Sequence, residues 1–272
     1  MNPANRLFSE IRNVAAIGGI GLATQYTVTV GRHLPTVFRS RSLNCVDHAF
    51  GNAGGWFIAN AFGISVCVPR DSIGLVRELY GNGAYFPSAS FRIQPGENVV
   101  DLGANCGVFT ALAAKLGGRV LAVEAQFGYM VELHEILDRN GCQADLEWAL
   151  VGPSSGTFAN AETPKRLDHF EGRTPPTVSM ADLLYRHRME RVDFLKCDIE
   201  GSEFDLFFKD NEWLSRVRRI AMEVHPTCGD PATLRELLVR RGFTVSMRDD
   251  DIPDDSIDAR PQVLYATTDR AD

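Results

Sequence analysis

The sequence lacks the marks of several classes of protein. Its six cysteines include no C-x-x-C pair and no zinc-binding spacing, so a reducing compartment is expected. Its net charge of −7 argues against nucleic acid as the main partner, because phosphate binding relies on clustered basic side chains. The apolar stretch over 14–23 is shorter than the roughly 20 residues that span a bilayer. We therefore expect a cytoplasmic protein with no nucleic-acid partner and no stable membrane insertion.

Short apolar runs alternate with amphipathic stretches from about Glu97 onward, as in a parallel sheet covered by helices. The pattern predicts strands over 98–102, 119–124, 144–151, 192–197, 219–224, 243–247 and 263–267. Helices are predicted over 108–115, 129–140, 180–187, 203–209 and 231–241. The last two strands have no helix between them and should form an antiparallel pair at the sheet edge. The predicted fold class is α/β: a doubly wound, Rossmann-like sheet of seven mostly parallel strands.

The first third of the chain is less regular. It contains a predicted strand over 63–69, a short helix over 72–80 and a buried or peripheral helix around 14–23. We assign residues 1–90 to an irregular N-terminal extension that caps the substrate side, and residues 91–272 to the domain that carries the site. Composition does not reveal the oligomeric state, and a homodimer is compatible with it.

The most informative segment is VVDLGANCGVFT, in which a buried strand ends at Asp101 and a loop containing Gly103 and Gly107 leads into a helix. The first strand-to-helix turn of a doubly wound sheet lies at the ligand crevice. The loop has no third glycine at the spacing that dinucleotides require, and it suits a ligand with an amino-acid end. Glu124 ends the second strand, where an acid can accept hydrogen bonds from ribose hydroxyls. Together these features indicate S-adenosylmethionine.

Four stretches in order, VVDLGANCGVFT, LAVEAQ, FLKCDIEGSEFDL and IAMEVH, resemble the FkbM family of S-adenosylmethionine-dependent methyltransferases. The resemblance covers roughly 75–243. It implies a class I methyltransferase fold and methyl transfer, usually to a hydroxyl on a sugar, glycoconjugate or polyketide. It implies six cofactor-binding residues: Asp101, Gly103, Asn105 and Gly107 at the methionine end, Glu124 at the ribose and Ala149 beside the adenine.

The ends of the fourth and fifth predicted strands carry the candidate reacting groups. Asp198 and Glu223 should face one another there, and their oxygens suit Mg²⁺. A metal would lower the pKa of a coordinated hydroxyl, and a neutral His225 could then take the proton. Glu200 and Lys196 complete the catalytic candidates. Simpler interpretations stay open: Glu200 can stabilise the dipole of the following helix, Lys196 can pair with a carboxylate, and His225 can be structural.

We weigh three other functions. A nicotinamide dehydrogenase is disfavoured by the missing third glycine. A non-catalytic binding module that keeps the fold would be favoured by loss of Asp101 or Glu124, yet both acids are present. Methylation of an amine is disfavoured because Asp198 is followed by Ile-Glu-Gly and not by paired prolines and an aromatic residue. We expect an O-methyltransferase for a small-molecule or oligosaccharide acceptor, with a polyketide or other secondary metabolite as the alternative.

Overall fold

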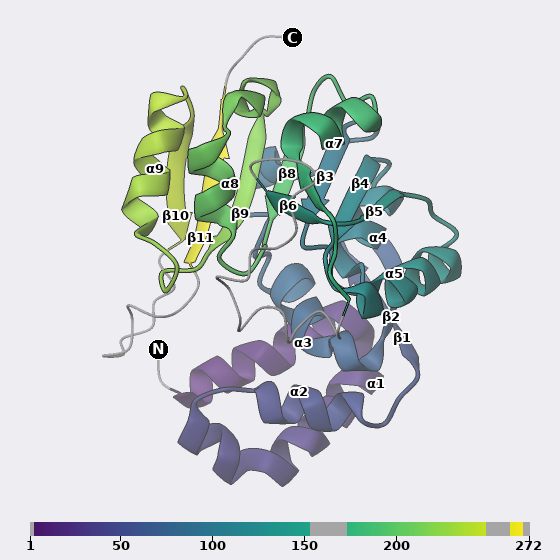
Figure 1. Ribbon diagram of the computed structural model, residues 1–272. Helices are drawn as coiled ribbons and strands as arrows, with labels where there is room; N and C mark the ends of the chain where they lie inside the picture. The colour runs from purple at the N-terminus through teal and green to yellow at the C-terminus, as the bar shows by residue number, and fades with distance from the viewer. Residues whose placement is uncertain (1–2, 153–172, 249–261, 269–272) are drawn as a thin grey trace.

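The computed structural model describes residues 3–152, 173–248 and 262–268, and its centre is a seven-stranded sheet (Figure 1). The strand order is β10-β11-β9-β8-β3-β4-β5. Neighbouring strands are parallel except β11, which runs antiparallel to β9 on one side and to β10 on the other. The strands of this sheet are β3 (Asn98–Leu102), β4 (Arg119–Glu124), β5 (Asp145–Trp148), β8 (Phe194–Cys197), β9 (Arg219–Val224), β10 (Thr244–Arg248) and β11 (Gln262–Thr267). The predicted fold class is confirmed.

Helices cover both faces of the sheet, as the alternation of apolar runs predicts. They are α4 (Val108–Lys115), α5 (Phe127–Asn140), α7 (Met180–Arg186), α8 (Glu203–Lys209) and α9 (Pro231–Arg240). Alternate residues of β3 enter opposite layers: Val99 packs with α4 and α5, and Val100 packs with α7, α8 and α9. The five helices predicted for this half are confirmed to within two residues at either end.

The strand predicted over 144–151 is divided in two. Its first part is β5, whereas β6 (Leu150–Gly152) leaves the main sheet and pairs in parallel with β7 (Thr177–Ser179). The break falls at Ala149, whose amide donates a hydrogen bond to the Glu124 carbonyl over 3.1 Å. The sequence pattern over 144–151 gives no sign of such a change of partner, because periodicity does not specify which strand lies alongside.

The N-terminal segment forms a helical layer with a hairpin. It consists of α1 (Pro3–Ser40), α2 (Asn44–Gly51), β1 (Trp56–Ala61), β2 (Ile64–Pro69), α3 (Ile73–Val76) and a further helical turn over Arg77–Gly81. Gly19 interrupts α1 with a φ of 76°. The part of α1 over Leu7–Ser40 is long and apolar enough to cross a membrane, although Pro35 and the Gly19 kink lie inside it. Far more of this segment is helical than the sequence pattern predicts.

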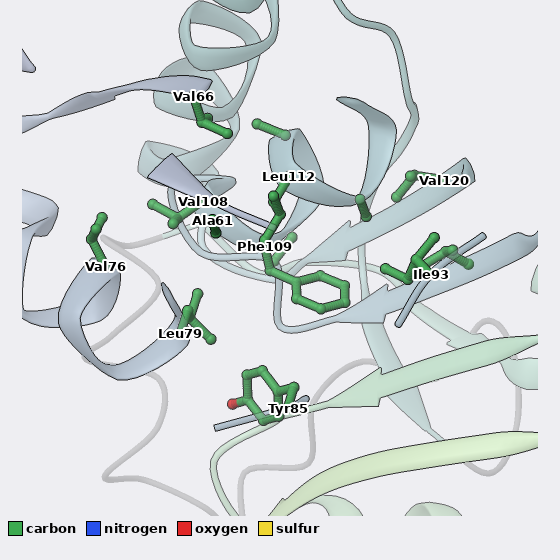
Figure 2. Close-up of a cluster of buried hydrophobic side chains, with 14 of the residues drawn as sticks. Ala61, Val66, Val76, Leu79, Tyr85, Ile93, Val108, Phe109, Leu112 and Val120 are labelled. Atoms are coloured by element: carbon green, nitrogen blue, oxygen red, sulfur yellow. The ribbon is translucent and has the colours of Figure 1, made fainter. Parts of the chain in front are cut away.

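The N-terminal layer lies below the carboxyl ends of the parallel strands in Figure 1. One buried cluster joins it to the sheet, and Figure 2 shows Val66 and Leu79 of the N-terminal segment with Phe109 of α4. The Tyr85 ring lies at right angles to the Phe109 ring, with centroids 6.0 Å apart. The division at about residue 90 stays a prediction, and the packing shows that the extension is in close contact with the sheet.

Candidate active site

The loop after β3 reaches the loop after β8 at the carboxyl edge of the sheet. Gly103 has a φ of 75°, and a Cβ atom there would lie 1.7 Å from the Asp198 carbonyl oxygen. No other residue fits that contact without moving the backbone. Asn105 and Gly107 also have positive φ, and Gly107 leads into α4. The tight loop therefore places the predicted cofactor site directly beside the predicted reacting groups.

Glu124 holds the same loop from the neighbouring strand. Its Oε2 accepts a hydrogen bond from the Asn105 amide and its Oε1 accepts one from the Gln126 amide, both over 2.7 Å. Burial raises the pKa of Glu124, although the two amide hydrogen bonds oppose that shift. A carboxylate offers about four lone-pair positions, so each oxygen keeps one for a further donor. The arrangement fits a pair of ribose hydroxyls.

Asp101 lies beneath the loop and not in the crevice. Its side chain is fully buried, Oδ2 accepts a hydrogen bond from the Thr110 hydroxyl over 2.6 Å, and Oδ1 lies 3.2 Å from Lys196 Nζ. Direct contact between Asp101 and a cofactor ammonium group, which the sequence led us to expect, does not fit this burial. Asp101 instead anchors the loop through its two neighbours.

Lys196 is buried under the same loop. Its Nζ donates hydrogen bonds to the carbonyl oxygens of Gly103 over 2.5 Å and Leu102 over 3.3 Å. Burial works against its charge, but Asp101 and Asp198 outweigh burial and raise the pKa of Lys196. These contacts suit a supporting role for Lys196 beneath the loop, and its catalytic role stays a prediction.

Asp198 and Glu223 lie together, as the neighbouring strand ends predict, and Tyr85 joins them. The Tyr85 hydroxyl lies 3.2 Å from Asp198 Oδ2 and 3.4 Å from Glu223 Oε2. Burial, together with the Asp198 and Glu78 carboxylates, raises the pKa of Glu223 to about 8. Burial also raises the pKa of Asp198, against the opposing charge of Lys196. We name Tyr85, Asp198 and Glu223 the oxygen cluster.

His225 is held by two glutamates at the end of β9. Its Nδ1 lies 2.8 Å from Oε1 of the fully buried Glu203, and its Nε2 lies 3.4 Å from Oε2 of the exposed Glu200. Burial alone would lower the pKa of His225, but hydrogen bonds with Glu200 and Glu203 outweigh it and raise the pKa to about 10. These contacts favour the imidazolium form of His225, so the neutral His225 base stays a prediction that this arrangement does not favour.

Two donor sets for a metal ion share Asp198. One is the predicted pair with Glu223, and the other joins Asp198 to Glu200 and His225, whose ligand atoms lie within 4.8 Å of one another. The second set includes two residues that we predicted as catalytic and not as ligands. Tyr85 and Glu203 were not predicted as site residues, and no spacing signal points to Tyr85, which lies 113 residues before Asp198.

Comparisons with known proteins agree with this geometry. Residues 101–245 match the family model of the methyltransferase FkbM domain. The protein Methyltransferase 1 of Beauveria bassiana strain ARSEF 2860 is 33% identical over 85 residues, which cover 30% of this chain and 29% of that protein. The chain therefore matches less than a third of the length of that relative.

Solved structures of similar fold include an rRNA methylase from Streptococcus thermophilus, with 14% identity, a TM-score of 0.42, and coverage of 66% of this chain and 90% of that one. The N-terminal domain of human METTL16 in complex with SAH shows 16% identity and a TM-score of 0.41, and the match covers 74% of this chain and 70% of that one. At these identities the likeness concerns the fold alone.

The sheet has a doubly wound, Rossmann-like strand order, with one antiparallel strand inserted next to the edge. The chain belongs to the family of the methyltransferase FkbM domain. The site fits S-adenosylmethionine in one respect: both oxygens of Glu124 keep a lone pair for the ribose hydroxyls.

Proposed function

We propose that this protein is an O-methyltransferase that acts on a hydroxyl of a sugar or glycoconjugate. The observation that carries the proposal is the oxygen cluster, which lies beside the loop over 103–107 through the contact of Gly103 with the Asp198 carbonyl. Carboxyl and phenol groups that can accept or donate protons suit recognition of a hydroxyl. A hydroxyl of a polyketide or other secondary metabolite is the alternative acceptor.

The cofactor would be held by the loop over 103–107 and by Glu124, with Ala149 beside the adenine. Bound S-adenosylmethionine supplies an electrophilic methyl group on a sulfonium, which needs no acid to activate it. Lys196 and Asp101 keep the loop in place from below through the carbonyl of Gly103. Most of the protein's contribution is then the alignment of the acceptor oxygen with the methyl group.

Asp198 is the residue that we propose to receive the acceptor's proton. Burial raises its pKa, which makes it a stronger base than an exposed carboxylate, and the Lys196 charge opposes part of that shift. Glu223, with a pKa of about 8, is protonated at pH 7 and can donate a hydrogen bond to the acceptor. The cationic His225 fixes Glu200 at the mouth of the site. Glu200 is the second candidate base because its side chain is 82% exposed.

We further propose that a divalent cation such as Mg²⁺ assists the reaction. Asp198 with Glu223, or Asp198 with Glu200 and His225, would hold it, and either set offers ligands that hard cations accept. Binding at His225 would first require loss of the imidazole proton, which favours the oxygen pair. A bound cation would replace the proton on Glu223 and would favour an ionised acceptor oxygen.

Transfer of a radioactive methyl group from S-adenosylmethionine to a panel of sugars tests the proposal, with Mg²⁺ or with EDTA. We expect a product that is stable to the base treatment that removes methyl esters. Asp198→Asn should reduce kcat at least about 100-fold. Asp205→Asn is the matched control, because this acid is exposed on α8 and pairs with Lys209.

Two results would contradict the proposal. Labelled amines with no labelled hydroxyls would assign a different acceptor class. Binding of S-adenosylhomocysteine without transfer to any acceptor of the panel would favour the non-catalytic binding module. Equal rates with Mg²⁺ and with EDTA would contradict only the proposed metal assistance, and Asp198 would remain the proposed base.

A further inference from the structure

The second part of α1 exposes an uncharged face over several turns. Its apolar members are strongly exposed: 83% for Ile20, 50% for Val28, 37% for Leu34 and 52% for Phe38. At 3.6 residues per turn these positions fall on one side of the helix, together with small or uncharged exposed residues. We define this set as the α1 outer face: Ile20, Thr24, Thr27, Val28, Gly31, Leu34, Pro35 and Phe38.

The opposite side of α1 is part of the folded core. Tyr26 is fully buried, and its hydroxyl donates a hydrogen bond of 2.6 Å to Asp47, which also pairs with Arg77 over 2.7 Å. Val30 and Val37 belong to the same buried cluster. Insertion of α1 across a bilayer would break this network and leave Asp47 and Arg77 without Tyr26. The helix can therefore meet a membrane only in the plane of its surface.

The charge of this region is opposite to that of the chain. Residues 11–46 contain no aspartate or glutamate and carry four arginines, whereas the whole chain carries −7. Arg32 and Arg39 are exposed on α1, about two helical turns apart and on the same border of the outer face. An apolar helix face bordered by arginines is the pattern of helices that lie in the interface of an anionic membrane.

We propose that the α1 outer face docks on an anionic lipid surface. Ile20, Val28, Leu34 and Phe38 enter the acyl boundary, while Arg32 and Arg39 meet lipid phosphates. The positive charge of Arg32 and Arg39 favours an anionic lipid surface over a second copy of the chain. A second copy would bring its own arginines to the same border, where like charges repel. The proposal goes beyond the proposed acceptor class and does not depend on it.

Docking in this way would bring the site close to the membrane. The N-terminal layer lies on the side of the sheet where the parallel strands end (Figure 1). The turn over Arg77–Gly81 packs on α1, since Gly81 lies against Asn13 and Ile17, and Tyr85 follows this turn and reaches Asp198. An acceptor carried by a lipid would then meet the oxygen cluster from the membrane side.

Flotation of the full-length protein with lipid vesicles tests the proposal at low ionic strength. We expect binding to vesicles that contain phosphatidylglycerol and weak binding to vesicles of phosphatidylcholine alone. The double variant Ile20→Ser with Phe38→Ser should lose affinity about 100-fold or more. The double variant Arg32→Gln with Arg39→Gln should lose affinity about 30-fold, at about fivefold for each charge near the surface.

Matched controls separate docking from general surface hydrophobicity. Val131→Ser on α5 and Val239→Ser on α9 remove exposed apolar side chains, 64% and 50% exposed, away from α1 and should bind vesicles as the wild type does. All variants should keep the circular dichroism spectrum and the affinity for S-adenosylhomocysteine of the wild type. Retained cofactor binding distinguishes a failure of docking from a failure of the proposed function.

Three results would overturn the proposal. In the first, the wild type does not bind phosphatidylglycerol vesicles. In the second, the double variant Ile20→Ser with Phe38→Ser binds them as strongly as the wild type. In the third, light scattering finds a wild-type dimer that the same double variant converts to monomers, with no vesicle binding by either. That outcome would assign the α1 outer face to a second copy of the chain.

Discussion

Replacement of His225 by alanine tests the pairing of the imidazolium with Glu203. The structure raises the pKa of His225 from 6.5 to about 10, and one pKa unit corresponds to about 1.4 kcal/mol, which sets an upper limit of about 5 kcal/mol. Glu200 is 82% exposed, so solvent screens its share of that energy. Glu203 is fully buried and loses its charged partner. We expect His225→Ala to lower the free energy of unfolding by about 3 kcal/mol at pH 7.

Urea unfolding of wild type and variant, in EDTA and at several pH values, measures this difference. A histidine whose folded pKa is raised gives stability that is fully present below 6.5 and is lost as the pH rises through about 10. The difference between wild type and variant should therefore shrink between pH 7 and pH 10. A double variant, His225→Ala with Glu203→Gln, should recover part of the loss because no buried charge remains. A difference below about 1 kcal/mol at pH 7, or one that stays constant up to pH 10, would refute the pairing.

Three further substitutions test the loop and the oxygen cluster. Lys196→Met leaves the fully buried Asp101 without its cation and should lower stability by about 3 kcal/mol or more in urea unfolding, whereas a loss under about 1 kcal/mol would contradict the supporting role. Gly103→Ala should lower stability by about 3 kcal/mol and abolish cofactor binding, because its Cβ would lie 1.7 Å from a carbonyl oxygen. Tyr85→Phe should lower kcat about tenfold with little change in KM and should shift the acid limb of the pH–rate profile; an unchanged profile would remove Tyr85 from the cluster.

The helices and strands over 98–148, 180–248 and 262–267 could be predicted in detail because their signals are local. Each strand is a short apolar run and each helix an amphipathic one, and Gly141, with a φ of 59°, ends α5 where an Asn-Gly pair stands in the sequence. The same local signals do not determine which strands pair. The transfer of 150–152 to β7 and the 38-residue α1 depend on packing against distant segments. The helix also contains Gly19 and Pro35, residues that argue against a helix when read alone.

The candidate site could be located but not fully interpreted from the sequence. The meeting of Asp198 with Glu223 follows from parallel strand order, since both stand at strand ends. The protonation state of His225 does not follow, because it depends on a buried glutamate on α8 whose direction a sequence does not give. The place of Tyr85 is set by the Tyr265 hydroxyl, which donates a hydrogen bond of 2.6 Å to the neighbouring Ala84 carbonyl.

Calorimetric titration with S-adenosylhomocysteine is the most direct test of the central claim, that this site binds S-adenosylmethionine through the loop over 103–107 and Glu124. We predict micromolar binding by the wild type, no binding of NAD, and an affinity at least about tenfold lower in Glu124→Ala, which loses the charged acceptor for the ribose. Glu147→Ala, an acid on β5 that pairs with Arg186, should bind as the wild type does. No binding of S-adenosylhomocysteine up to millimolar concentration, or equal affinity in wild type and Glu124→Ala, would contradict the account.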